Sequence, residues 1–207
     1  MEVENFFDNV NFFKKSFPIM VCDLPPEIVE EIKECVILCD RIKDHRLAML
    51  LNHKNAGHNS FQVSLPRSWF LESFLFPYLI KAGEYYFYKD SLNPSEKIRI
   101  EIQDLNSNYF NYGVWLNYSF KGDFNNLHHH YPCYIVGVIY VENTSEEPTV
   151  FEDGFEFFGK PGQMIVFPGM YGHGVRVKKT LQRRLTIAFN LNVIPLEDKD
   201  NFSGVFN

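Results

Sequence analysis

Apolar residues recur at the spacing of one helix face between residues 25 and 40. The side chains that form this stripe are Ile28, Val29, Ile32, Cys35, Val36 and Cys39. Asp23 precedes the stripe and is a suitable N-cap, so the pattern predicts an amphipathic helix over residues 25–40. A second helix is expected over residues 68–88, with Ser68 as its cap, and Pro77 should kink or divide it.

From residue 97 onward the pattern changes to short alternating or apolar runs separated by turn-forming stretches. These runs predict strands over 97–103, 113–120, 134–141, 149–152, 163–167, 173–177 and 184–192, and residues 17–22 predict one more. Many short strands after two helices indicate a mainly β fold of the α+β type, an antiparallel sandwich or barrel with helices on one side. We expect a single domain, with residues 97–195 as its β core and residues 1–96 as a helical support; residues 41–66 predict no clear element.

The composition agrees with a sheet-rich core and narrows the class of partner. The 207 residues include 21 Phe, 11 Tyr and 2 Trp, which favour strands and half-buried surfaces. A net charge of −6 and a pI near 5.6 argue against nucleic acid as a partner, because nucleic-acid-binding domains usually carry a basic stripe. Four cysteines without a CxxC pair favour reduced thiols, and no apolar run reaches the roughly 18 residues of a membrane span. We therefore expect a cytoplasmic protein without membrane contact.

Four of the seven histidines fall in two places, His128 to His130 and His173. On a strand, His128 and His130 point to one face and His129 to the other. Two imidazoles on one strand and a third on a neighbouring strand are a common way for a sheet to build an open metal site. Three consecutive histidines in a solvated loop are the alternative interpretation.

The last predicted strand has two different faces. Leu185, Ile187, Phe189 and Leu191 form an apolar face, whereas Arg184 is followed on the opposite face by Thr186, Ala188 and Asn190. A guanidinium beside small side chains suits a bound dicarboxylate, although an exposed Arg on a surface strand fits the same pattern. A register slip would exchange Arg184 for Arg183, but only Arg184 leaves the apolar residues together on one face. Tyr140 either adds a hydroxyl to the same pocket or fills core.

A series of short motifs follows in order between residues 115 and 190. They are Trp115-Leu116-Asn117-Tyr118, Lys121-Gly122-Asp123-Phe124-Asn125-Asn126, His128-x-His130, Gly137-Val138-x-Tyr140-Val141, Phe151-Glu152-Asp153, Pro161-Gly162-x-x-Ile165-Val166-Phe167-Pro168, His173-x-Val175 and Arg184-x-x-Ile187-x-Phe189-Asn190. In this order and at these spacings the set resembles the Fe(II)- and 2-oxoglutarate-dependent oxygenases, specifically a small prolyl-hydroxylase-like group common in phages and bacteria. The resemblance covers a little over a third of the chain and depends on the ordered set.

The resemblance implies a double-stranded β-helix, a jelly roll of the kind that cupins also have, whose open end holds Fe(II). It implies that His128 and His173 are iron ligands and that Arg184 binds the distal carboxylate of 2-oxoglutarate. Tyr118, ten residues before His128, and Tyr140 would add hydroxyl contacts to the cosubstrate. The implied reaction is a dioxygenase reaction, such as a hydroxylation, in which dioxygen and 2-oxoglutarate are consumed and succinate and CO2 are released.

The third metal ligand departs from the usual pattern of this superfamily. Most members have Asp or Glu two residues after the first His, whereas this chain has His130. Three neutral ligands would leave a ferrous site with a formal charge of +2 rather than +1, which favours anion binding. Asp153 is an alternative source of a carboxylate, but the fixed spacing between His128 and His130 favours His130.

Two other functions fit parts of the pattern. A cupin-like metalloenzyme that does not use 2-oxoglutarate would also have His-x-His and a distant His, but it normally has a Glu shortly after the pair, and residues 133–136 read Cys-Tyr-Ile-Val. A jelly roll without catalytic activity is the other alternative. The oxygenase interpretation leaves a small molecule or a protein side chain as the substrate, and we expect the N-terminal helices to buttress the sheet and to contribute to a homodimer contact.

Overall fold

A computed structural model of the chain describes residues 11–14, 17–43, 61–64, 71–90, 98–102, 113–143 and 147–196. The statements below concern these residues. Cys39, in the apolar stripe of the first predicted helix, and Ser68, the predicted cap of the second, lie outside the residues whose side chains are described.

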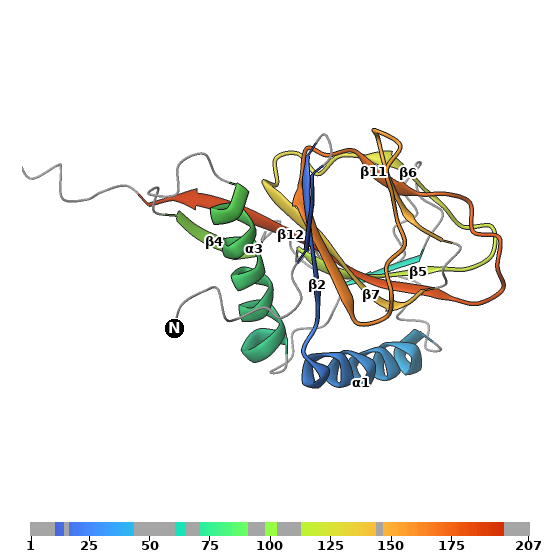
Figure 1. The fold of residues 1–207 in the computed structure, drawn as a ribbon. Coiled ribbons are helices and arrows are strands. Elements are labelled where there is room, and N and C mark those ends of the chain that lie inside the picture. Colours follow the sequence, from blue (N-terminus) through green and yellow to red (C-terminus); the bar gives the residue numbers. More distant parts are fainter. Residues whose placement is uncertain are drawn as a thin grey trace, which may run out of the picture.

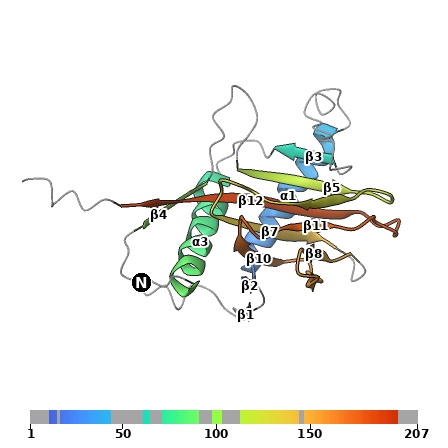
Figure 2. The ribbon, with the colours of Figure 1, turned by 90° about the horizontal axis from the view of Figure 1, so that it is seen from above.

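The larger of two sheets has eight strands. Along the hydrogen-bonded path they are β1 (Asn11–Lys14), β2 (Pro18–Asp23), β10 (Gln163–Pro168), β7 (Ile135–Glu142), β12 (Arg184–Pro195), β5 (Val114–Ser119) and β3 (Phe61–Ser64), and β4 (Ile98–Ile102) pairs with β12 away from this path. The strand pairings of this sheet are antiparallel, as the short alternating runs predict. Figure 2 shows β12 as the long strand whose far end runs beside β4.

The smaller sheet has four strands in the order β6 (Asn125–His128), β11 (His173–Val175), β8 (Thr149–Phe151) and β9 (Glu156–Phe157). From β5 to β12 the chain passes repeatedly between the two sheets, which face each other (Figure 1). This arrangement is a double-stranded β-helix, and it confirms the predicted jelly roll.

Two apolar cores cover the two faces of the large sheet. One face packs against helices α1 (Pro26–Lys43) and α3 (Phe76–Asp90) and includes all four apolar residues of the β12 face predicted from the sequence, Leu185, Ile187, Phe189 and Leu191. The other face packs against the small sheet through Val136, Val138 and Tyr140, with Phe151 and Phe157 opposite. The strand period of two separates these cores, and the histidines and Arg184 lie on the side of the small sheet.

Several predicted elements need correction. Residues 1–96 supply the predicted strand β2 and, in addition, β1 and β3, for which no strand was predicted, to the large sheet. The second helix is divided, as Pro77 predicts: a π-helical turn (Leu71–Leu75) precedes α3, and Pro77 lies in the first turn of α3, where its missing N–H costs no hydrogen bond. β9 falls in a stretch for which no strand was predicted.

No helix in the described ranges combines the length and the apolar character that crossing a membrane requires. Cys22, Cys35 and Cys133 form no disulfide.

Candidate metal centre

Three histidines meet at one end of the small sheet. His128 is the last residue of β6 and His173 is the first residue of β11, and the antiparallel pairing places them directly opposite each other. His130 follows β6 by two residues, and its backbone N–H donates to Gly169 O at 2.8 Å. The ring centroids lie 4.6 Å (His128 to His173), 5.0 Å (His128 to His130) and 5.1 Å (His130 to His173) apart. One nitrogen of each ring can thus be chosen so that all three lie within 4.8 Å of one another, as in a metal-binding group.

Backbone carbonyls determine the tautomer of two of these rings. His128 Nδ1 lies 2.8 Å from Asn126 O, and His173 Nδ1 lies 3.1 Å from Tyr171 O. A carbonyl oxygen only accepts, so each Nδ1 carries the hydrogen and each Nε2 keeps a lone pair for a metal. Burial, with the neighbouring His128 and His130, lowers the pKa of His173 well below its ordinary value, which keeps this ring neutral and able to bind a metal.

The sequence predicts that His128 and His130 reach a common point because they lie on one strand. The rings do converge, but β6 ends at His128, and His130 is placed by the loop and by its bond to Gly169. His129 points away, with Nε2 at 3.3 Å from the exposed carboxylate of Glu152. Asp153, the alternative ligand, is exposed, accepts from the backbone N–H of Phe155 at 3.0 Å, and is not part of the three-histidine group.

Arg184 lines the same cavity as the three histidines and is only 2% exposed. Its Nη2 donates to Thr149 Oγ1 at 3.3 Å, and Thr149 Oγ1 lies 2.6 Å from the hydroxyl of Tyr140. Its Nε is buried without a hydrogen-bond partner, and no carboxylate within the described part of the chain forms an ion pair with this guanidinium. Burial lowers the pKa of Arg184, while Tyr140 and Glu147 act in the opposite direction. A buried cation with an open donor suits a bound anion.

Arg183, the alternative to Arg184, has a different set of partners. Its Nε donates to Glu142 Oε2 at 2.7 Å, and its Nη1 donates to Asp40 Oδ2 at 2.8 Å. Arg183 thereby links α1 to β7, and its guanidinium is already bound by the carboxylates of Glu142 and Asp40. The geometry therefore favours Arg184 as the cation of the cavity.

The two candidate tyrosines lie on opposite faces of the large sheet. Tyr140 lies on the cavity side, with the guanidinium carbon of Arg184 at 5.6 Å from its ring centroid. Tyr118 is opposite Leu185 across the β5–β12 pairing and is buried in the helix-facing core. Tyr118 does not line the cavity, because the alternation of side chains along β5 turns it away.

The same alternation brings Asn117 and Trp115 to the cavity, and sequence reasoning did not assign either a role. Asn117 is opposite Thr186 on β12, and both line the cavity. Trp115 Nε1 donates to Asn117 Oδ1 at 3.2 Å, which directs the amide of Asn117, and the Trp115 ring stacks on His130 at 6.0 Å between centroids. The signal in the sequence that could have identified Asn117 is a polar residue within an otherwise apolar strand. The structure places this residue opposite Thr186.

By fold and site, this chain is a jelly-roll protein with a three-histidine cluster and a buried cation in one cavity. No protein-family profile matches the chain, and no curated protein matches it. Among solved structures, a prolyl-4-hydroxylase from Pseudomonas putida matches with a TM-score of 0.54 and 13% identity, over 84% of this chain and 91% of that chain.

HygX from Streptomyces hygroscopicus, solved with nickel and 2-oxoglutarate bound, matches with a TM-score of 0.52 and 13% identity, over 84% of this chain and 82% of that chain. The same protein solved with hygromycin B in addition matches with a TM-score of 0.51. At this identity the likeness is one of fold, and it supports the predicted jelly roll. The narrower resemblance to a phage and bacterial group stays a prediction.

Proposed function

We propose that this protein is an Fe(II)- and 2-oxoglutarate-dependent dioxygenase that oxidises a small molecule or a protein side chain. One observation carries the proposal: a single cavity holds three convergent histidines and a buried guanidinium that has no carboxylate partner among the described residues. These are the two kinds of group that a metal and a dicarboxylate cosubstrate need in one place. The fold shared with HygX, a protein that was solved with 2-oxoglutarate, adds support.

The donor set fits a ferrous ion. His128, His130 and His173 would hold it, and imidazole nitrogen is a suitable ligand for iron. Because these three ligands are neutral, they would leave the full positive charge on a bound metal, and the site would attract anions more strongly than one with a carboxylate ligand. The carbonyls of Asn126 and Tyr171 keep two of the rings in the tautomer that ligation requires.

The polar residues beyond the histidines fit a dicarboxylate. Arg184 would bind the carboxylate distant from the metal, with the hydroxyls of Thr149 and Thr186 and the amide of Asn117 as further hydrogen-bonding groups. Tyr140 holds Thr149 by the 2.6 Å hydrogen bond and thereby orients it toward Arg184. When both are bound, the iron and 2-oxoglutarate supply the oxidising chemistry, in which dioxygen is consumed and succinate and CO2 are released. The chain binds and orients these groups and shields them with Val138, Ala188 and Trp115.

Two adjacent arginines provide the test. Arg184→Ala should weaken 2-oxoglutarate binding by about 100-fold, because the charge-assisted hydrogen bonds to the distal carboxylate are lost. Metal affinity should not change. The measurement is calorimetric titration with 2-oxoglutarate, together with 2-oxoglutarate-dependent formation of succinate in the Fe(II)-loaded protein.

Arg183→Ala is the matched control. It should lower the free energy of unfolding by about 1–2 kcal/mol by breaking the hydrogen bonds to Glu142 and Asp40, and it should leave 2-oxoglutarate affinity unchanged. An Arg184→Ala variant that binds 2-oxoglutarate as well as the unaltered protein would refute the proposed site.

A further inference from the structure

A buried ion pair lies close to Arg184, outside the set of residues that line its cavity. The Lys178 side chain is 0% exposed and its Nζ donates to Glu147 Oε1, and the Glu147 side chain is 5% exposed. Thr180 donates to the same carboxylate oxygen. Removing two charges from water is costly and a buried pair often contributes little net stability, so the pair invites a functional explanation.

Glu147 lies near Arg184 but does not bind it. It precedes Thr149 by two residues, the spacing that returns an extended chain to the same side, and Thr149 is the residue that accepts from Arg184. The negative charge of Glu147 acts on Arg184 and raises its pKa against the effect of burial. Nevertheless, Glu147 Oε2 and Arg184 Nε are both buried, and neither has a hydrogen-bond partner among the residues that the structure describes. The carboxylate of Glu147 and the guanidinium of Arg184 therefore carry opposite charges but do not hydrogen-bond to each other through these two atoms.

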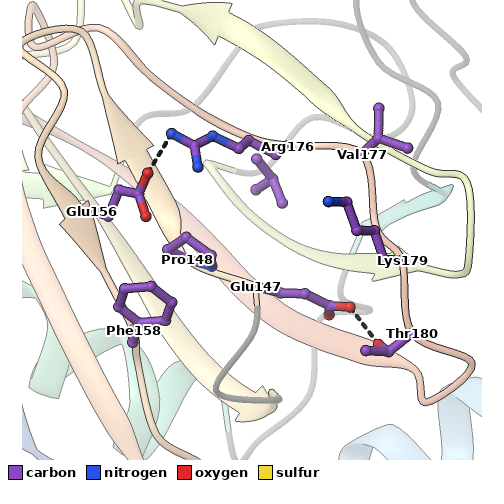
Figure 3. A pocket seen from close by; sticks show the side chains of 9 residues that line it. Glu147, Pro148, Glu156, Phe158, Arg176, Val177, Lys179 and Thr180 are labelled. Carbon is purple, nitrogen blue, oxygen red and sulfur yellow. Dashed lines mark hydrogen bonds and ion pairs between the residues drawn. The ribbon is translucent and has the colours of Figure 1, made fainter.

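The second pocket shows what surrounds Glu147 on its other side (Figure 3). Glu147 and Thr180 line this pocket, which has a volume of about 270 Å³ and shares Val175 with the metal cavity. Its arginine, Arg176, is already bound to Glu156. Lys179 also lines this pocket, but it is Lys178 whose Nζ donates to the Glu147 carboxylate.

We infer that Lys178 is a positioning residue for the cosubstrate: by binding Glu147 it prevents this carboxylate from occupying Arg184, which therefore stays open to the distal carboxylate of a 2-oxo dicarboxylic acid. The inference rests on the proposed function. The charges of Lys178, Glu147 and Arg184 sum to +1, which matches the one carboxylate that Arg184 would receive. Without Lys178, Glu147 and Arg184 would neutralise each other, and an incoming carboxylate would have to displace Glu147.

The test compares two probes on Mn(II)-loaded full-length protein by calorimetry. Lys178→Met removes the charge and keeps much of the side-chain volume. It should weaken 2-oxoglutarate binding at least about tenfold, because Glu147 loses Lys178 as its partner and pairs with Arg184 instead. The affinity for 2-oxopentanoate, which lacks the distal carboxylate, should not change. Lys178→Arg keeps the charge and should bind 2-oxoglutarate as the unaltered protein does. In turnover, Lys178→Met should raise the KM for 2-oxoglutarate and leave kcat unchanged.

Rescue separates this role from simple structural support. The double variant Lys178→Met with Glu147→Gln removes the competing charge and should regain most of the affinity for 2-oxoglutarate. Glu147→Gln alone should bind 2-oxoglutarate a few fold more tightly than the unaltered protein, and this variant decides the matter if Lys178→Met does not fold.

The inference is overturned if Lys178→Met keeps full affinity, if both probes weaken together, or if Glu147→Gln neither tightens binding nor rescues. A different result, in which the unaltered Mn(II) protein does not bind 2-oxoglutarate, would instead reject the proposed function.

Discussion

At the level of single residues, the three histidines are held in different ways. His128 and His173 are each fixed by an Nδ1–H bond to a backbone carbonyl, whereas the described contacts of the His130 ring include stacking on Trp115 and on His173. The rings are tilted by 25° and 12° from parallel in these two stacks. The position of His130 thus depends on its loop and on aromatic packing, and it is the ligand whose assignment most needs a direct test.

His130→Ala and Asp153→Ala distinguish the two candidates for the third ligand. His130→Ala should weaken metal binding by at least about 100-fold, beyond the 10–100-fold cost that is typical for a partner outside the ligand shell. Asp153→Ala should keep metal affinity, because Asp153 lies in the turn after β8 and is outside the group of three. Competition with a fluorescent chelator measures both affinities. Loss of metal from Asp153→Ala with retention by His130→Ala would reverse the assignment.

Asn117 and Tyr118 are neighbours that face opposite cores. Asn117→Ala should weaken 2-oxoglutarate binding by about tenfold, because a hydrogen bond to a charged ligand is lost. Tyr118→Phe should leave this affinity unchanged, since Tyr118 packs on the helix-facing side of the sheet. The two variants are compared by calorimetric titration of the metal-loaded protein. The opposite order of effects would show that Tyr118 reaches the cosubstrate.

At the level of elements, alternation along the strands decided which residues reach the cavity. For β12 the sequence was sufficient to assign each residue to a face, because its apolar and other residues alternate without interruption. It correctly placed Arg184 and Leu185 on opposite faces. Tyr118 was assigned from its distance along the chain to His128, and that distance does not determine a face of β5. His130 could not be placed from periodicity, because β6 ends at His128 and the following loop is fixed by a contact with Gly169, distant in sequence.

Two glycines test how this loop contributes. A Cβ at Gly169 would lie 2.1 Å from Cys133 O, and one at Gly137 would lie 2.1 Å from the Phe189 ring. Either Gly→Ala substitution should lower the free energy of unfolding by about 1–3 kcal/mol through overpacking, as urea unfolding would measure. Only Gly169→Ala should also weaken metal binding, because Gly169 O holds the backbone of His130. Equal metal affinity in both variants would show that the loop does not position His130.

At the level of the whole molecule, the jelly roll and its covering helices form two apolar cores, one on each face of the large sheet. The helix-facing core, with α1 and α3, stabilises the large sheet, and the core between the sheets borders the candidate site through Val138 and through Phe151 and Phe167, which pack against His173. The β core followed from the many short alternating runs. In the N-terminal region β2 was predicted, but β1 and β3 were not, because residues 61–64 lie in a stretch of mixed polarity and residues 11–14 add to the sheet only by pairing with β2.

The central claim is that one cavity binds Fe(II) and 2-oxoglutarate together. Anaerobic titration of the Fe(II)-loaded protein with 2-oxoglutarate, followed by visible absorption, tests this claim most directly. We expect a saturable charge-transfer band, because a 2-oxo acid that chelates ferrous iron accepts charge from it, and no band with succinate, which lacks the 2-oxo group. A protein that holds Fe(II) but develops no band at any 2-oxoglutarate concentration would contradict the claim.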